Sequence, residues 1–329
     1  MKSFAYASPT TEGEVLSLLA EPGEIEILAG GTDLVGLMKK MVITPDLVVN
    51  ILDVPSLKTI EQLDEGAIAI GAAVTLDEVL AHPYLDPYPA IEQAIQGISS
   101  MQLQCQGTIG GEVLQRPQCW YFRGGRGLLA GGGAAVEEGD SRYHAIFAND
   151  GPAKFVSASR IAPALIALQA TARLVGPTEE DKRYIPVEQL FRVPRHEGER
   201  ENILARGQFL THFVLPDRRN FASATYEVRQ GAGPDFPLAS AAASLRIEDG
   251  IVREAGVILG QVAPTPWISY EAADAIIGQA VNAETAEAAG LAAVASANPL
   301  THNAYKVQLA KTAVKRAILR AAGQETGGF

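Results

Sequence analysis

The chain has 329 residues, of which 47% are hydrophobic and 20% charged, and its formal net charge is −11. This composition is typical of a globular protein and excludes a chain that is disordered throughout. The acidic balance, with no concentrated basic face, argues against a nucleic-acid binder. No run of eighteen apolar residues occurs, so we expect no membrane span, and the length predicts two or three domains.

The N-terminal residues and the cysteines favour a reducing compartment. Residues 1–6 have neither the apolar core nor the small-residue cleavage site of a signal peptide. Cys105 and Cys119 are too few for a disulfide framework or for the four ligands of a zinc or iron–sulfur centre. We therefore expect two structural thiols, no metal site and a cytoplasmic protein.

Residues 1–56 are predicted to form a small βαβ unit. After a helix that starts at residues 8–11 and ends at Pro22-Gly23, residues 24–28 read as a short strand that leads into a helix over residues 34–41. Residues 47–51 are β-branched and uncharged, which is typical of a buried strand. Because a helix connects the two strands, we expect them to be parallel.

Residues 57–219 are predicted to form a second subdomain. The expected elements are strands over 67–74, 145–147, 171–175 and 209–215, and helices over 76–81, 90–98 and 161–170. Residues 123–139 are rich in glycine and poor in periodic apolar positions. We expect them to form a long surface loop, and such loops in compact domains are usually functional.

A domain boundary is predicted near residues 217–220, where proline and polar residues interrupt the pattern. The expected elements beyond it are strands over 222–228, 239–247 and 251–259, followed by helices over 269–277, 283–297 and 305–322. Strands followed by segregated helices predict an α+β domain with a three-stranded antiparallel sheet. The chain would thus consist of domains 1–219 and 220–329.

The segment from Ala29 to Leu34, A-G-G-T-D-L, lies between a predicted strand and a predicted helix. Glycine allows a ligand to approach the backbone closely, and a helix start offers free N–H groups to an anion. We expect a phosphate or pyrophosphate here, with Thr32 adding a hydroxyl and Asp33 capping the helix. A plain strand–helix turn is the alternative, since the segment follows neither the Rossmann nor the Walker pattern.

A second glycine-rich segment, Gly107 to Leu114, contains T-I-G-G, and residues 71–75 add a third glycine-containing stretch. Two such segments in one domain favour a dinucleotide, which has two phosphates and a long body. The aromatic residues of 115–123, between two arginines, would either stack on a flat ring or plug the loop that follows. The five histidines lack the spacing of ligands, and only His144 is a candidate. These features predict a flavin protein whose cofactor carries the chemistry.

In this order, A-G-G-T-D-L, G-A-x-V-T, T-I-G-G and Q-R-P-x-C-W-Y-F-R resemble the FAD-binding (medium) subunits of the molybdenum hydroxylases, a group that includes xanthine dehydrogenase, aldehyde oxidoreductase and carbon monoxide dehydrogenase flavoproteins. Residues 259–266 look like the family's L-G-x-V-A-P-x-P, and the segment from Asn303 to Ala317 looks like its closing helix. The resemblance covers nearly the whole chain.

The resemblance implies a FAD-binding domain of the vanillyl-alcohol-oxidase type, followed by a small α+β domain. It also implies two partners, a large molybdenum–pterin subunit and a small subunit with two [2Fe–2S] clusters. Electrons would pass from molybdenum through these clusters to FAD and then to NAD, a quinone or oxygen. In such proteins A-G-G-T-D-L holds the pyrophosphate and T-I-G-G lies against the flavin. A Gly31→Val substitution should therefore abolish FAD retention while leaving the fold intact.

No catalytic side chain is expected on this chain, but many of its residues are expected to bind the cofactor. These are Leu28, Ala29, Gly30, Gly31, Thr32, Asp33, Leu34, Ala73, Thr75, Ser100, Gly107, Thr108, Gly110, Gly111, Glu112, Val113, Leu114, Tyr121, His144, Ser159, Arg160 and Leu165.

Several positions depart from the family's pattern. Glu112 stands where the family usually has Asn, and Ser159-Arg160 where many members have Asp. Many relatives also have a Lys near Glu227 and an Arg near Gly231, and some carry a [4Fe–4S] cluster on four cysteines of the long loop. This chain has only Cys119 there, so we predict no cluster.

Two other functions stay open at this stage. One is a self-sufficient FAD oxidase of the same superfamily, which would need a base or a covalent attachment beside the flavin. The other is a scaffold subunit without cofactor, which the residues at Glu112 and Arg160 would favour. Export within a folded complex, on a signal carried by another subunit, also stays open.

Overall fold

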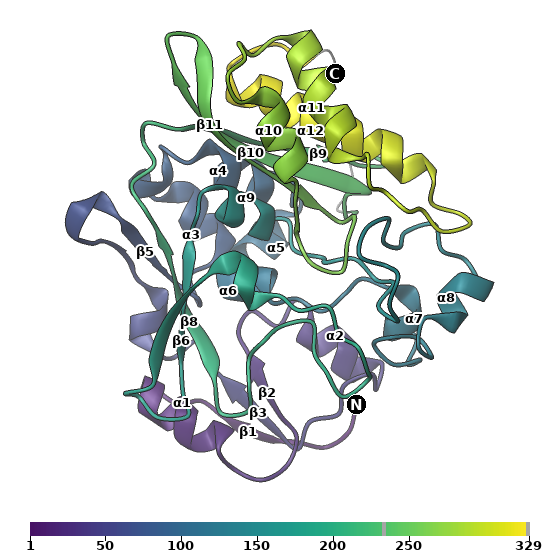
Figure 1. Ribbon diagram of the computed structural model, residues 1–329. Helices are drawn as coiled ribbons and strands as arrows, with labels where there is room; N and C mark the ends of the chain where they lie inside the picture. Colours follow the sequence, from purple (N-terminus) through teal and green to yellow (C-terminus); the bar gives the residue numbers. More distant parts are fainter. Residues whose placement is uncertain (232–234, 327–329) are drawn as a thin grey trace.

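The structure is a computed structural model that describes residues 1–231 and 235–326. These residues form three sheets, which follow one another from the N-terminal sheet at the bottom of Figure 1 to the C-terminal sheet at the top.

The N-terminal sheet is parallel because a helix connects each of its strands to the next. It has the order β1-β3-β2, and its elements are β1 (Ala5–Ala7), α1 (Glu12–Leu19), β2 (Ile25–Leu28), α2 (Leu34–Lys39) and β3 (Leu47–Asn50). The predicted parallel pairing of residues 24–28 with 47–51 is confirmed. Strand β1 was not predicted, because it has three residues, two of them exposed, and so shows no apolar pattern.

The middle sheet has five antiparallel strands in the order β4-β5-β8-β6-β7. Its strands are β4 (Ile60–Gln62), β5 (Ile68–Gly71), β6 (Thr171–Val175), β7 (Lys182–Pro186) and β8 (Phe209–Leu215). The order places β8 between β5 and β6, although it comes more than thirty residues after β6. The apolar residues of these strands pack with α9 in one core.

Short helices fill the long connections of this middle part. They are η1 (Pro55–Lys58), η2 (Asp64–Gly66), α3 (Leu76–Ala81), η3 (Pro83–Leu85), α4 (Pro89–Gln96), α5 (Met101–Gln106), α6 (Ile109–Val113), α7 (Trp120–Arg123), α8 (Ala134–Glu138), α9 (Ala162–Ala167) and η4 (Val187–Leu190). Thr75 and Glu78 form a capping box at the start of α3, in which each side chain accepts a backbone N–H of the other residue.

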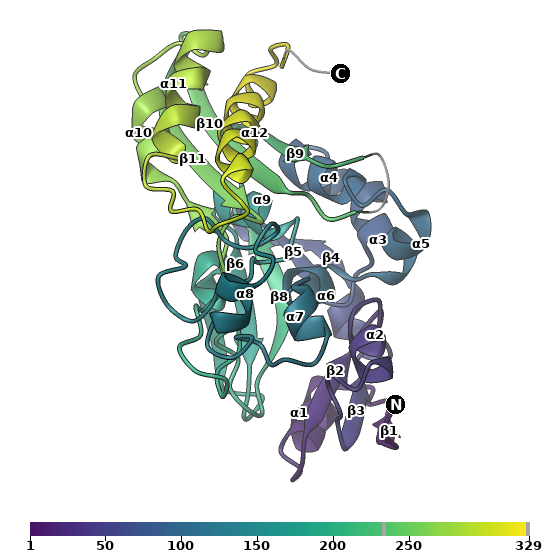
Figure 2. The ribbon, with the colours of Figure 1, turned by 90° about the vertical axis from the view of Figure 1, so that its right-hand side faces the viewer.

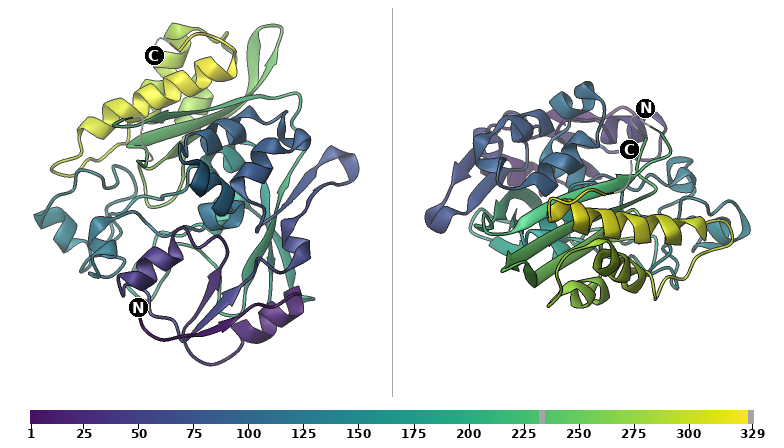
Figure 3. Two further views of the ribbon diagram at one scale, coloured as in Figure 1. Left: turned by 180° about the vertical axis from the view of Figure 1, so that it is seen from behind. Right: turned by 90° about the horizontal axis from the view of Figure 1, so that it is seen from above.

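The C-terminal sheet is antiparallel and lies between two layers of helices (Figures 1 and 3). Its elements are β9 (Ala222–Val228), β10 (Ala239–Glu248), β11 (Ile251–Gly260), β12 (Trp267–Ile268), α10 (Tyr270–Ile276), α11 (Ala283–Ala293) and α12 (Tyr305–Ala321). Along β10, Ala241 and Ala243 face α12, whereas Ala242 faces the core of the middle part. Small side chains allow both helix layers to pack closely against this sheet.

The structure corrects several predicted elements. The C-terminal sheet has a fourth strand, β12, which is too short to show alternation after the prolines of 264–266. Residues 145–147 are not a strand: the N–H groups of Ile146 and Phe147 donate to the same carbonyl, that of Val262. The predicted loop at 123–139 contains α8, and the helix predicted to reach residue 170 ends at Ala167.

The middle and C-terminal parts are joined where α4 covers the free edge of β9 (Figure 2). The N–H of Thr225 donates to Gln93 Oε1, and its hydroxyl donates to the carbonyl of Ala90, both at 2.8 Å. On the other side, Arg173 of β6 pairs with Glu12 of α1 and thereby ties the N-terminal part to the middle sheet. Among the described residues, no helix is both long and apolar enough to cross a bilayer.

Candidate functional site

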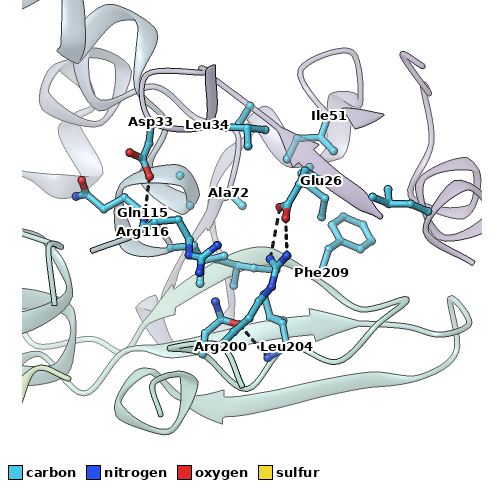
Figure 4. Close-up of a pocket in the computed structure, with 18 of the residues that line it drawn as sticks. Glu26, Asp33, Leu34, Ile51, Ala72, Gln115, Arg116, Arg200, Leu204 and Phe209 are labelled. Atoms are coloured by element: carbon cyan, nitrogen blue, oxygen red, sulfur yellow. Dashed lines mark hydrogen bonds and ion pairs between the residues drawn. The ribbon is translucent and has the colours of Figure 1, made fainter. Parts of the chain in front are cut away.

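A cavity of about 460 Å³ opens between the N-terminal part and the middle sheet (Figure 4). Three segments supply most of its wall: residues 23–34, which contain β2 and the turn after it, residues 108–116, which contain α6, and residues 200–210, which lead into β8. Segments far apart in the chain meet here because β8 returns to the centre of the middle sheet beside β5.

The turn after β2 owes its two glycines to two different constraints. A Cβ atom on Gly30 would overlap the backbone carbonyl of Gln106 at the end of α5, so only glycine fits there. Gly31 has φ +71°, a left-handed conformation that side chains rarely adopt. The glycines therefore allow a tight turn whose backbone lines the cavity.

This turn presents five consecutive backbone N–H groups that donate to no acceptor within the described residues, those of Gly30 to Leu34. Thr32 is exposed and the other four residues are half-buried, and the first N–H groups of a helix lack partners within the helix. A row of them along a cavity wall is the donor set that an anionic oxygen requires. The turn thus has the donor groups that the predicted binding of a phosphate or pyrophosphate would use, and that binding stays a prediction.

Asp33 does not cap α2, contrary to the expectation from the sequence. Its carboxylate accepts the backbone N–H of Arg116 at Oδ2 (2.8 Å) and Nη2 of Arg123 at Oδ1 (2.6 Å). A charge-assisted pair in a largely buried place is stronger than a cap on an exposed helix end. Asp33 therefore joins the turn to the segment at 115–123.

The T-I-G-G segment forms the start of α6, and the N–H groups of Ile109, Gly110 and Gly111 donate within the protein. Thr108 caps the helix by accepting the N–H of Gly111 at 3.2 Å, while Ile109 and Gly110 donate to the carbonyls of Val74 and Ala72. A Cβ on Gly110 would lie 2.8 Å from the Cβ of Ala72. The segment thus contributes a smooth, uncharged wall rather than a second anion site.

Residues 200–210 form the wall that the sequence did not predict. Arg200 forms an ion pair with Glu26 of β2 across the cavity, as Figure 4 shows, and Arg206 donates to the carbonyl of Glu21 at 2.5 Å. Leu204 and Phe209 add apolar surface. The signal for these residues is weak, since a charged, turn-rich stretch says nothing about the cavity it will border.

Comparisons with known proteins show the family of the chain. The family model described as "FAD binding domain in molybdopterin dehydrogenase" matches residues 2–218, and the one described as "CO dehydrogenase flavoprotein C-terminal domain" matches residues 224–321. The chain belongs to the FAD-binding medium subunits of the molybdenum hydroxylases. It is an oxidoreductase subunit, and FAD is its cofactor.

Relatives and solved structures match over almost the whole chain. The aldehyde oxidoreductase FAD-binding subunit PaoB of Escherichia coli (strain K12) is 32% identical, over 98% of this chain and 100% of that protein. The carbon monoxide dehydrogenase medium chain of Hydrogenophaga pseudoflava is 25% identical, over 96% of each. A solved carbon monoxide dehydrogenase from the same organism has a similar fold, with a TM-score of 0.76, 24% identity and 97% of each chain covered.

The family's Asn position, here Glu112, does not line the cavity of this medium subunit. The Glu112 side chain is buried and accepts hydrogen bonds from Ser159 Oγ (2.7 Å) and from the N–H groups of Arg160 (2.6 Å) and Ile161 (3.3 Å). Burial raises the pKa of the carboxyl, and these hydrogen bonds oppose the rise. Glu112 thus fixes the segment that leads into α9.

Arg160, which with Ser159 stands where the resemblance led us to expect Asp, belongs to the same buried group. Its guanidinium donates to the carbonyls of Gly97 and Asp235, and it lies 3.6 Å from the carboxylate of Glu227. Burial raises the pKa of Glu227 to about 7, against the effect of Arg160 and Arg229. The departures from the family's pattern therefore form a polar cluster of their own outside the cavity wall.

The structure brings part of the predicted site together. The predicted residues that line the cavity are Ala29, Gly30, Gly31, Thr32, Asp33, Leu34, Thr108, Gly110, Gly111 and Leu114. The predicted residues outside its lining are Leu28, Ala73, Thr75, Ser100, Gly107, Glu112, Val113, Tyr121, His144, Ser159, Arg160 and Leu165.

Most of these outer residues have evident structural contacts. Thr75 and Ser100 cap α3 and α5, and Leu165 lies in the apolar core. His144 is buried with Nε2 3.2 Å from Cys119 Sγ, and its pKa is lowered to about 4, mainly by burial.

Proposed function

We propose that this medium subunit carries FAD and transfers electrons within a molybdenum-containing hydroxylase or dehydrogenase complex. Bound FAD would take up electrons from the [2Fe–2S] clusters of a partner and pass them to NAD, a quinone or oxygen. The observation that carries this proposal is the row of free N–H groups from Gly30 to Leu34 along the cavity wall, which suits the diphosphate of a dinucleotide.

The residues of the cavity divide the work of holding FAD. The turn at 30–34 would bind the diphosphate. The glycine face of α6 would let a flat or extended part of the cofactor approach the backbone. Apolar side chains of the wall, among them Ile51, Leu204 and Phe209, would exclude water from the body of the cofactor.

The names of the relatives support the wider assembly. PaoB is called a FAD-binding subunit, and two carbon monoxide dehydrogenase relatives are called medium chains. We therefore propose a large molybdenum–pterin partner and a small [2Fe–2S] partner for this chain. The free cysteines Cys105 and Cys119 support a reducing, cytoplasmic compartment for the complex.

The proposal includes the domain division expected from the sequence. Residues 1–219 would be a FAD-binding domain of the vanillyl-alcohol-oxidase type, composed of a βαβ subdomain (1–56) and a second subdomain (57–219). Residues 220–329 would be the small α+β domain. The parallel N-terminal sheet and the separate C-terminal sheet support this division.

An absorption spectrum of the purified chain, followed by denaturation and chromatography, tests the proposal. We expect about one FAD per chain. A chain that holds no FAD, even after incubation with it, would contradict the proposal and favour a scaffold subunit. Turnover of a reducing substrate by the purified chain alone would instead favour a self-sufficient oxidase.

A further inference from the structure

Arg116 is a cavity residue whose charged group the fold leaves open to a ligand. It follows α6 and lines the cavity together with the turn at 30–34. Its side chain is only 16% exposed. The guanidinium carbon lies 4.9 Å from the centroid of the Phe122 ring, and Nε faces the carboxylate of Glu201. The guanidinium therefore has a fixed, largely dry position.

The two terminal nitrogens of this guanidinium have no protein partner. Across residues 1–231 and 235–326, neither Nη1 nor Nη2 of Arg116 donates a hydrogen bond to another group. Of the three guanidinium nitrogens, only Nε is both buried and without a hydrogen bond. Nη1 and Nη2, which also lack hydrogen bonds, therefore keep accessible surface. A planar fork with two open donor groups matches the oxygens of a phosphate.

The main chain of Arg116 is fastened to the turn. Its N–H donates to Asp33 Oδ2 at 2.8 Å, a bond that is drawn in Figure 4. Arg123 donates through Nη2 both to Asp33 Oδ1 (2.6 Å) and to the carbonyl of Arg116 (2.9 Å). One carboxylate and one guanidinium thus hold Arg116 beside the five free N–H groups.

Two other arginines beside the cavity form ion pairs with carboxylates, and Arg206, which also lines it, donates to the carbonyl of Glu21. Glu26 pairs with Arg200 across the cavity, and Asp33 pairs with Arg123. Arg116 pairs with Glu201 through Nε and leaves its two Nη groups available. A diphosphate brings at least two negative charges, which the partial charges of N–H groups balance only in part. A cation beside the turn would balance the rest of this negative charge.

We propose that Arg116 binds the diphosphate of the nucleotide that the turn at 30–34 holds, and that Asp33 is the residue that positions Arg116. The ligand class is a nucleoside diphosphate, free or as part of FAD. The inference rests on the proposed function for the identity of the physiological ligand. It adds Arg116 as the charged hydrogen-bond donor of the site.

The test is a titration of the flavin-free full chain with FAD and, separately, with ADP. Charge-assisted hydrogen bonds imply that Arg116→Gln weakens both ligands by about 10- to 100-fold, since both carry a diphosphate. The affinity of Arg116→Lys should lie between those of the parent chain and Arg116→Gln, because lysine keeps the charge but cannot donate two parallel hydrogen bonds. Arg126→Gln, which removes an exposed arginine of the same segment, is the matched control and should bind both ligands like the parent chain.

A double variant keeps the test valid if Arg116→Gln unfolds the chain. Glu201 is buried, so removing Arg116 leaves a buried carboxylate without its cation. Arg116→Gln with Glu201→Gln removes both charges and should show the same loss of ADP and FAD. Unchanged ADP affinity in a folded double variant would overturn the assignment of Arg116.

A thermodynamic cycle tests the positioning role of Asp33. Asp33→Asn should weaken ADP in the parent chain but have little further effect in the Arg116→Gln background. Equal effects in both backgrounds would show that Asp33 acts on the fold alone. A parent chain that binds no FAD would contradict the proposed function, whereas a parent chain that binds FAD, with ADP affinity unchanged by Arg116→Gln, would contradict only this inference.

Discussion

Single glycines of the cavity have different physical reasons to be glycine, and the difference decides which of them reports on the ligand. Gly31 has a left-handed backbone, and a Cβ there would lie 3.2 Å from the side chains of Leu28 and Val35. The Gly31→Val substitution suggested by the sequence would therefore strain the turn itself. Loss of FAD in that variant would not distinguish a blocked site from a damaged one.

Gly111 is the better probe. A Cβ on Gly111 meets only Thr108 Oγ1 at 3.0 Å, and nothing else lies within 4 Å, so a side chain there extends into the open cavity. Gly111→Leu should raise the FAD dissociation constant by about tenfold or more, while the melting temperature of the flavin-free chain changes little, since leucine favours a helix. Gly36→Leu, on the exposed side of α2 with no neighbour within 4 Å, is the control. A Gly111→Leu chain that binds FAD like the Gly36→Leu chain would place the cofactor elsewhere.

At the scale of elements, α4, the segment before α9 and β9 meet in the polar cluster formed by Glu112, Arg160, Glu227 and Arg229. The two oxygens of Glu227 accept no hydrogen bond, and the guanidinium nitrogens of Arg160 and Arg229 lie 3.6 and 3.8 Å from one of them. Attraction to the two arginines at these distances only partly offsets the free-energy cost of burying the ionised Glu227 carboxylate. Protonation of Glu227 therefore stabilises the contact between these elements.

The sign of the resulting pH dependence follows from the pKa of Glu227, which is raised from 4.5 to about 7. The folded chain holds this proton more tightly, so the stabilisation is complete below about pH 4.5 and is lost as the pH rises toward 7. The loss is roughly 3 kcal/mol of unfolding free energy, as an upper value. Urea unfolding between pH 4.5 and 7.5 should show a smaller decline in Glu227→Gln than in the parent chain. Glu188→Gln, an exposed carboxyl of η4, is the control, and parallel profiles for all three chains would contradict the prediction.

Elements with a strong local pattern were predictable from the sequence, and elements that depend on distant partners were not. The helix predicted over 76–81 has the bounds of α3, and the mostly apolar run at 209–215 predicted β8. In contrast, β1 and β12 have three and two residues and exist through pairing with β3 and β11. The same division explains the cavity: the glycine turn has a local signal, whereas Arg200 and its neighbours border the cavity because of the sheet order.

Across the whole molecule, the cavity is the place where the N-terminal part, α6 and the segment before β8 meet, so a ligand there connects three segments. Away from the cavity, the C-terminal part is held to the middle part by contacts such as those of Thr225 with α4. Lys306 at the start of α12 is buried and donates to the carbonyl of Gln261 at 2.7 Å. We therefore expect ligand binding to stabilise the contacts around the cavity more than the contacts of the C-terminal part.

Hydrogen exchange measured with and without FAD tests this expectation. A ligand that binds only the folded state stabilises it by about 2.7 kcal/mol when its free concentration is 100 times the dissociation constant. Amides of residues 24–34, 108–116 and 200–210 should gain the most protection, because local opening of these segments breaks ligand contacts directly. Amides of α12 should gain the least. The Gly111→Leu chain at the same FAD concentration should show a smaller gain, about 1.4 kcal/mol if its dissociation constant is tenfold higher. An equal gain in α12 and in the cavity segments would show that the ligand acts on the fold as a single unit.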